Sequence, residues 1–63
     1  MNDIRVMLVD DNADLRRCVR EYVDRQEGMT VVAECANGLE ALEQLGKTAV
    51  DVMVLDIIMQ LKL

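Results

Sequence analysis

The chain has 63 residues and a formal net charge of −5, and 52% of its residues are hydrophobic. This length permits one small domain, and the composition is that of a folded rather than a disordered chain. The acidic balance argues against direct nucleic-acid binding, which needs a basic face, and no apolar run reaches the roughly 18 residues that cross a membrane.

Two cysteines and no histidine limit the chemistry that the chain can perform. Cys18 and Cys35 lack the spacing of a zinc site, so we expect reduced thiols in a cytoplasmic protein, with a disulfide as the alternative. No signal peptide is recognisable at the N-terminus. Without histidine, a Ser-His-Asp or Cys-His catalytic system is excluded, and we expect a protein that is not an enzyme.

The first third of the chain predicts a strand followed by a helix. Residues 3–9 alternate and then become continuously apolar, as in a strand. Asp10, Asp11 and Asn12 follow, and any of the three can cap the helix predicted over residues 13–26. The apolar positions of this helix form one stripe: Leu15, Cys18, Val19, Tyr22 and Val23.

The opposite face of this helix is charged, and we interpret it as a solvated face, with a docking patch as the alternative. Three pairs on it lie four residues apart and can form ion pairs: Arg17–Glu21, Arg20–Asp24 and Glu21–Arg25. Gly28 is expected to end the helix in a left-handed conformation.

The rest of the chain predicts a second strand, a second helix and a third strand. Residues 30–36 are rich in β-branched side chains, and Asn37 can cap a helix over residues 39–45. Its expected inner positions are Ala41, Leu42 and Leu45. Residues 52–59 form an apolar run, typical of a strand buried on both faces. The order β-α-β-α-β predicts an α/β fold with a parallel sheet. Right-handed crossovers place the helices on opposite faces if the first strand lies between the other two, which is the order 2-1-3 that we expect.

Carboxylates follow or interrupt two of the predicted strands. Asp10 and Asp11 follow the first strand, and Asp56 interrupts the third apolar run. Because the carboxyl ends of parallel strands meet at one edge, we expect these acids to share one pocket. Taken singly, the first pair could be a helix cap and Asp56 a strand-terminating acid.

Three segments in this order resemble the receiver domain of bacterial two-component response regulators: Asp10-Asp11, residues 37–42 (NGLEAL) and residues 54–59 (VLDIIM). Within that family the chain is most similar to the receivers of the stage-zero sporulation master regulators. The resemblance implies a flavodoxin-like (CheY-like) fold and a phosphorelay that controls transcription.

The resemblance also implies roles for individual residues. Asp56 would be the phosphoacceptor, taking a phosphoryl group from a histidine on a histidine kinase or histidine phosphotransferase. Asp11, Asp56 and the backbone carbonyl of Ile58 would bind Mg²⁺ or another divalent cation directly, and Asp10 would act through a water. Magnesium prefers such oxygen ligands and keeps several waters.

The resemblance covers only the first half of the family's usual domain, and we expect the last two strands and an effector domain to be missing. We therefore expect impaired phosphorylation, and a homodimer in which residues 52–63 pair across a two-fold axis, edge to edge or swapped. The competing hypothesis is a self-assembling structural half-domain with a relic acidic pocket. A nucleotide-binding half-domain ranks lower, because the first turn has no glycine-rich phosphate loop.

Overall fold

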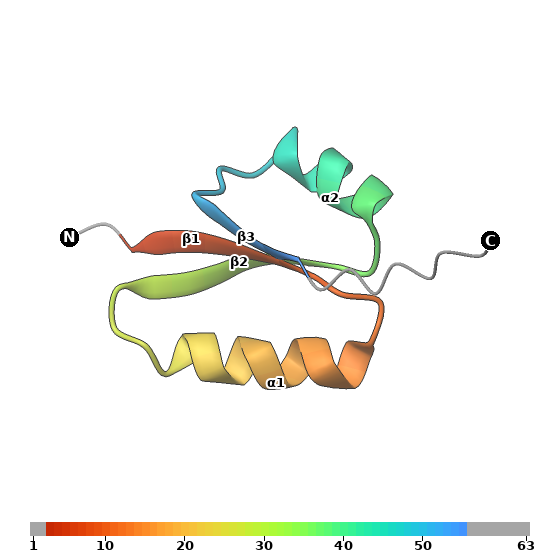
Figure 1. The fold of residues 1–63 in the computed structure, drawn as a ribbon. Coiled ribbons are helices and arrows are strands. Elements are labelled where there is room, and N and C mark those ends of the chain that lie inside the picture. The colour runs from red at the N-terminus through yellow and green to blue at the C-terminus, as the bar shows by residue number, and fades with distance from the viewer. Residues whose placement is uncertain (1–2, 56–63) are drawn as a thin grey trace.

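The fold is that of a computed structural model, which describes residues 3–55. Three parallel strands form one sheet, β1 (Ile4–Val9), β2 (Met29–Cys35) and β3 (Val52–Leu55), in the order β2-β1-β3. Figure 1 shows β1 between the other two strands. The predicted α/β class and the 2-1-3 strand order are therefore confirmed.

Two helices cover opposite faces of this sheet, as the right-handed crossovers predict (Figure 1). They are α1 (Ala13–Asp24) and α2 (Gly38–Leu45). Each helix begins at an asparagine whose side-chain oxygen accepts a backbone N–H three residues later, at 3.0 Å for Asn12 and 2.9 Å for Asn37. These bonds satisfy donors that the first turn leaves free. Neither helix of the described residues has the length and hydropathy that crossing a bilayer requires.

The core consists of two apolar clusters, one on each face of β1. Val6 and Leu8 point toward α1 and pack with Val23, while Met7 and Val9 point toward α2. The α2 cluster also contains Cys35 and Ala41. Successive side chains of a strand alternate between the faces, so one central strand supplies both clusters. All four of these β1 side chains are 7% exposed or less, which makes β1 the centre of the core.

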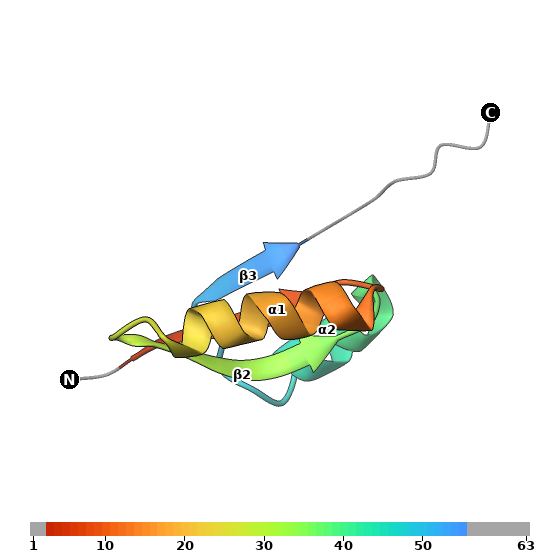
Figure 2. The same cartoon turned by 90° about the horizontal axis from the view of Figure 1, so that it is seen from below.

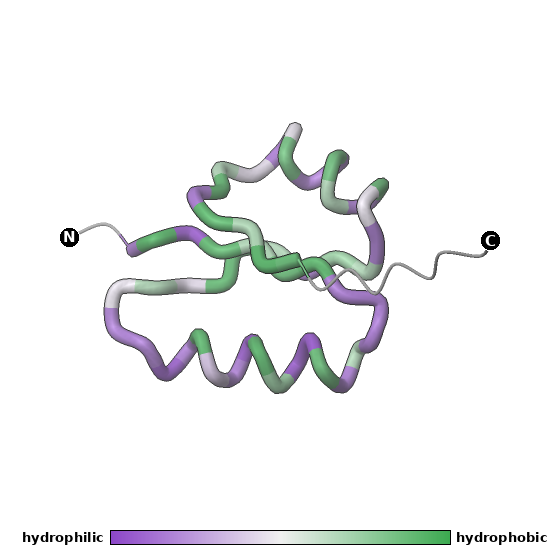
Figure 3. Tube along the Cα trace, in the orientation of Figure 1, coloured by the Kyte–Doolittle hydropathy of each residue, from purple (hydrophilic) through white to green (hydrophobic). Residues whose placement is uncertain are grey.

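The two outer strands differ in how open their free edges are. Opposite β1, the register of β2 jumps from Val31 to Ala33, so Val32 forms a β-bulge, a feature that discourages further pairing. The pairing of β3 is regular, and both helices contact only β1 and β2 (Figure 2). Figure 3 shows β3 as hydrophobic along its length. Its exposed hydrophobic side chains are Val52, Val54 and Leu55.

Several details of the helices were predicted wrongly. α1 ends at Asp24 rather than at residue 26. Gly28 does have a left-handed backbone, with φ of 83°, but it shapes the turn into β2, where its carbonyl accepts the N–H of Ile4 at 2.7 Å. In α2 only Ala41 is buried; Leu42 is 69% exposed, because a helix of eight residues that contacts only β1 and β2 turns that side to solvent.

The expected ion pairs along α1 were also wrong. In the described part of the chain, Arg17 pairs with Asp14 at 3.0 Å, one turn toward the N-terminus. Arg20 pairs with Glu34 of β2 at 2.9 Å. Both cysteines are free thiols, as expected, with Cys18 exposed and Cys35 buried.

A charged clasp joins the start of β3 to β1. The guanidinium of Arg5 donates to both carboxylate oxygens of Asp51 at 3.0 Å. The backbone N–H of Arg5 also donates to Asp51 Oδ2 at 2.9 Å, and the backbone N–H of Asp51 donates to the Arg5 carbonyl at 2.9 Å. The hydrogen bonds from Arg5 lower the pKa of Asp51 from 3.8 to about 2. The clasp fixes the register in which β3 enters the sheet.

Candidate functional site

The candidate site lies where β1 ends and α1 begins. Asp10 is the first residue after β1, and its backbone N–H donates to the Cys35 carbonyl at 3.0 Å, so the end of β1 stays joined to the end of β2. Asp10 is only 7% exposed, whereas Asp11 is exposed to solvent. The two acids therefore occupy different environments within one turn.

The turn is fixed by short bonds between side chains and backbone. Asp10 Oδ1 accepts the N–H of Asn12 at 2.8 Å, which forms a tight Asx turn. Asn12 in turn caps α1 through Leu15. Of the three candidate caps, the structure selects Asn12, which leaves the Asp11 carboxylate free of any capping role among the described residues.

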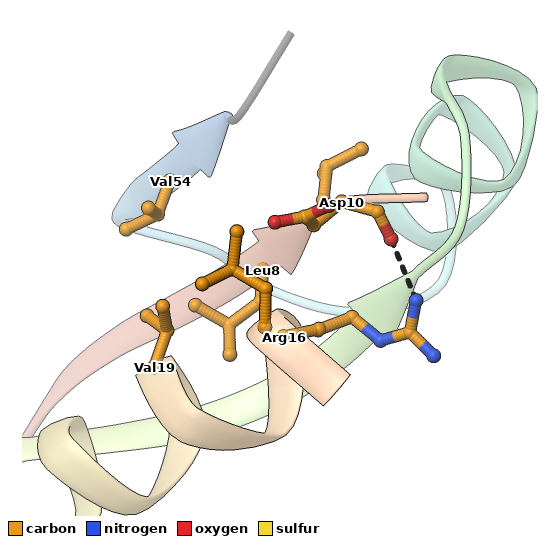
Figure 4. A pocket seen from close by; sticks show the side chains of 7 residues that line it. Leu8, Asp10, Arg16, Val19 and Val54 are labelled. Carbon is orange, nitrogen blue, oxygen red and sulfur yellow. Dashed lines mark hydrogen bonds between the residues drawn. The ribbon is translucent and has the colours of Figure 1, made fainter. Parts of the chain in front are cut away.

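Arg16 closes the turn from the helix side. Its Nη1 donates to the Asp10 carbonyl oxygen at 2.6 Å (Figure 4). Its Nε lies 3.4 Å from Glu34 Oε1, and Glu34 also receives the 2.9 Å bond from Arg20. Sequence reasoning placed Arg16 on a solvated helix face and missed this contact. Its position one turn into α1, directly after the acidic turn, is the signal that could have found it.

Beside this turn is a small pocket of about 160 Å³ between α1 and β3 (Figure 4). Its lining is mainly aliphatic, with one acid and one base at the β1 end: Leu8, Val9, Asp10, Leu15, Arg16, Val19 and Val54. Leu15 and Val54 are 42% and 39% exposed. The pocket therefore exists because neither helix covers β3 on this face.

The donor set suits a hard divalent cation. Asp10 and Asp11 supply adjacent carboxylates, and within residues 3–55 neither forms an ion pair with a lysine or arginine. Carboxylate oxygens are the ligands that Mg²⁺ prefers. No group of three acidic, cysteine or histidine side chains gathers within the described residues. The predicted phosphoacceptor Asp56 and the predicted ligand Ile58 lie outside them.

The pairing of β1 with β3 brings the ends of these strands level. Val9, the last residue of β1, pairs with Leu55, the last described residue of β3. The next residues along the chain are Asp10 after Val9 and Asp56 after Leu55. Asp10 and Asp56, two of the acids that the sequence predicts to share a pocket, therefore each directly follow one member of this pair of strand residues.

On the opposite face of the sheet, Cys35 lies under α2. Its burial, followed by the nearby Glu40 carboxylate, raises the pKa of its thiol. A thiol in this state is a poor nucleophile. Cys35 is therefore a core residue and no part of the candidate site.

Comparison with known proteins identifies the family. Residues 6–61 match the model of the response regulator receiver domain. The chain is 39% identical over 59 residues to protein-glutamate methylesterase/protein-glutamine glutaminase 5 of Myxococcus xanthus. The aligned stretch covers 94% of this chain and 17% of that protein. It is 41% identical over 54 residues to an uncharacterized response regulatory protein of Yersinia pestis, covering 86% of this chain and 23% of that one.

A second methylesterase/glutaminase, from Paramagnetospirillum magneticum, is 45% identical over 56 residues, covering 89% of this chain and 15% of that protein. No solved structure matches the chain significantly. The chain spans less than a quarter of the length of each of these relatives. None of the three is a sporulation regulator by name, so that narrower resemblance stays a prediction. The family match, the sheet order and the acidic turn agree: the chain belongs to the receiver domain family of two-component response regulators.

Proposed function

We propose that this chain is a phosphoryl-accepting module, in which Asp56 takes a phosphoryl group from a histidine of a histidine kinase or histidine phosphotransferase. In this transfer the phosphorus–nitrogen bond of the donor breaks and a bond to a carboxylate oxygen of Asp56 forms. The observation that carries the proposal is the pairing of Val9 with Leu55, because Asp10 and Asp56 follow these two residues. A carboxylate can serve as the nucleophile in such a transfer.

The cation that supports the transfer would be held by the acidic turn. We assign Asp11, Asp56 and the Ile58 carbonyl as direct ligands of Mg²⁺, with Asp10 acting through a water. Bound Mg²⁺ would neutralise negative charge on the transferring phosphoryl group. The residues of this chain hold the acids in place: the Asx turn at Asp10 and the cap at Asn12 leave Asp11 exposed and free to bind.

Nuclear magnetic resonance of the ¹⁵N-labelled chain tests this assignment. Addition of Mg²⁺ should shift the amide signals of Asp11 and of residues 56–58 with one common dissociation constant. Asp56→Asn should weaken that binding, and it should abolish the covalent adduct that a small phosphodonor forms with the wild type, read from the intact mass. Mg²⁺ shifts confined to other acids, or an adduct on the Asp56→Asn variant, would contradict the proposal.

The output of the protein to which this receiver contributes is a separate question. Two of the three relatives are named as protein-glutamate methylesterases, which favours a link to protein modification. The sequence resemblance instead predicts control of transcription, as in sporulation. We place the module in the cytoplasm in both cases. The region that adjoins the receiver in the gene decides between the two: a methylesterase region supports the first output, and a DNA-binding region supports the second.

We also propose that residues 1–63 make up only the first half of a receiver and associate as a homodimer through residues 52–63. Support comes from β3, whose Val52, Val54 and Leu55 are 39–51% exposed on an edge without a bulge. Sedimentation equilibrium should give twice the chain mass, and a folded monomer would contradict this. If the acidic pocket is only a relic of a structural half-domain, Asp56→Ala should stabilise the fold by relieving like-charge repulsion.

A further inference from the structure

Arg16 is held at several points, although its neighbours on α1 are solvated. Its side chain is 19% exposed, against 61% for the adjacent Arg17. Its Nε is buried without a hydrogen-bond partner among the described residues. A buried donor without a partner is costly, so some other contact must fix this orientation. The contact is the 2.6 Å bond from Nη1 to the Asp10 carbonyl.

This bond acts on the peptide unit that joins Asp10 to Asp11. The peptide is planar, so fixing its carbonyl oxygen also fixes the direction of the Asp11 N–H and Cα. On the other side of the turn, Asp10 Oδ1 holds the N–H of Asn12 at 2.8 Å. The backbone of Asp11 is therefore held on both sides, and its Cα–Cβ bond leaves the turn in a set direction.

Glu34 anchors Arg16 to the sheet. Its Oε2 accepts a hydrogen bond from Arg20 at 2.9 Å. Its Oε1 forms an ion pair with Arg16 Nε at 3.4 Å that is not a hydrogen bond, so the two arginines reach it from successive turns of α1. Bonds between ionised groups are stronger than neutral ones, and a shared carboxylate restricts both arginine side chains. The contacts run without a gap from Arg20 through Glu34 and Arg16 to the Asp10 carbonyl.

We propose that Arg16, anchored by Glu34, is a positioning residue that aims the Asp11 carboxylate at the cation and so raises the Mg²⁺ affinity of the site. This inference rests on the proposed function. A purely electrostatic role for Arg16 predicts the opposite sign, because a positive guanidinium beside the site repels Mg²⁺. Removal of the charge would then tighten Mg²⁺ binding, whereas loss of positioning weakens it.

The test is the Mg²⁺ titration of the ¹⁵N-labelled chain, followed at the Asp11 amide. Arg16→Lys keeps the charge but cannot reach both the Asp10 carbonyl and Glu34, and we expect about tenfold weaker binding, the lower end of the effect of residues that orient metal ligands. Arg16→Gln should also weaken binding. Arg17→Gln, which deletes the same charge one residue away, should leave the dissociation constant unchanged or slightly lower.

The outcomes separate the inference from the proposed function. Wild-type affinity in Arg16→Lys, or tighter binding in Arg16→Gln, overturns the positioning role while leaving the site intact. No Mg²⁺ shift at Asp11 in the wild type overturns the proposed site itself. If Arg16→Gln does not fold, Arg16→Lys decides the question, with dispersed amide signals as the evidence of folding.

Discussion

Replacing Leu8 by alanine should destabilise the fold more than any change on the outer face of α2. Leu8 is 2% exposed and packs with Val6 and Val23 beneath α1. Truncation of a buried leucine costs about 2–5 kcal/mol. Leu8 also borders the open pocket beside β3, so its side chain makes fewer packing contacts than one enclosed on all sides. We therefore expect Leu8→Ala to lower the free energy of unfolding by about 2–3 kcal/mol, the lower part of that range. A domain of 63 residues has about 3–9 kcal/mol of stability in total.

The matched control is Leu42→Ala, the same truncation at a side chain that is 69% exposed. Surface substitutions of this kind change stability by about 0.5 kcal/mol or less. Urea unfolding followed by far-ultraviolet circular dichroism measures both variants, at one fixed protein concentration because association would shift the midpoint. A loss of stability in Leu42→Ala as large as that in Leu8→Ala would refute the reasoning, since α2 would then have to be covered on its outer face.

Three further predictions concern the caps, the clasp and the thiols. Asn12→Ala removes the α1 cap and should cost about 1 kcal/mol in urea unfolding; an unchanged midpoint would show that the cap contributes nothing. Hydrogen bonds from Arg5 lower the pKa of Asp51 in the folded state to about 2. The contribution of the clasp to the stability of the fold is therefore complete above pH 3.8 and is lost as the pH falls toward about 2. The stability difference between wild type and Asp51→Asn should therefore be constant above pH 3.8 and shrink below it, and a difference that grows on acidification would have the wrong sign. In a thiol-labelling experiment, Cys18 should react in the native protein and Cys35 only after unfolding, giving one and then two adducts by mass; equal labelling rates would contradict the burial of Cys35.

The elements of the fold could be predicted because local patterns determine them. The apolar run before Asp10 predicted β1, and the alternation of strands and helices predicted a parallel sheet. The order 2-1-3 was expected with the receiver-type fold that the resemblance implies. Asn37 predicted the start of α2, and the turn Asp10-Asp11-Asn12 predicted the start of α1 without deciding which of its three residues is the cap. Such starts can be predicted because a capping side chain acts on a donor only three residues away. These signals are short in range, so one sequence was sufficient to identify them.

What could not be predicted depends on contacts between distant segments. Nothing in the periodicity of α2 shows that Leu42 faces solvent, because its burial requires a neighbour that the described fold does not supply. The clasp joins Arg5 to Asp51 across 46 positions, and the role of Arg16 depends on the reach of its side chain to the Asp10 carbonyl. Charged side chains of this kind look the same in sequence whether they are solvated or bonded.

The central claim is that the acids after β1 and the acid after residue 55 form one cation site. The most direct measurement uses Mn²⁺, a paramagnetic ion that accepts the same carboxylate ligands as Mg²⁺, in small amounts with the ¹⁵N-labelled chain. We predict that the amide signals of residues 10–12 and 55–58 broaden together, while those of Gly28 and Asp51, at the other end of the sheet, stay sharp. Broadening of only one of the two acidic segments would contradict a shared site.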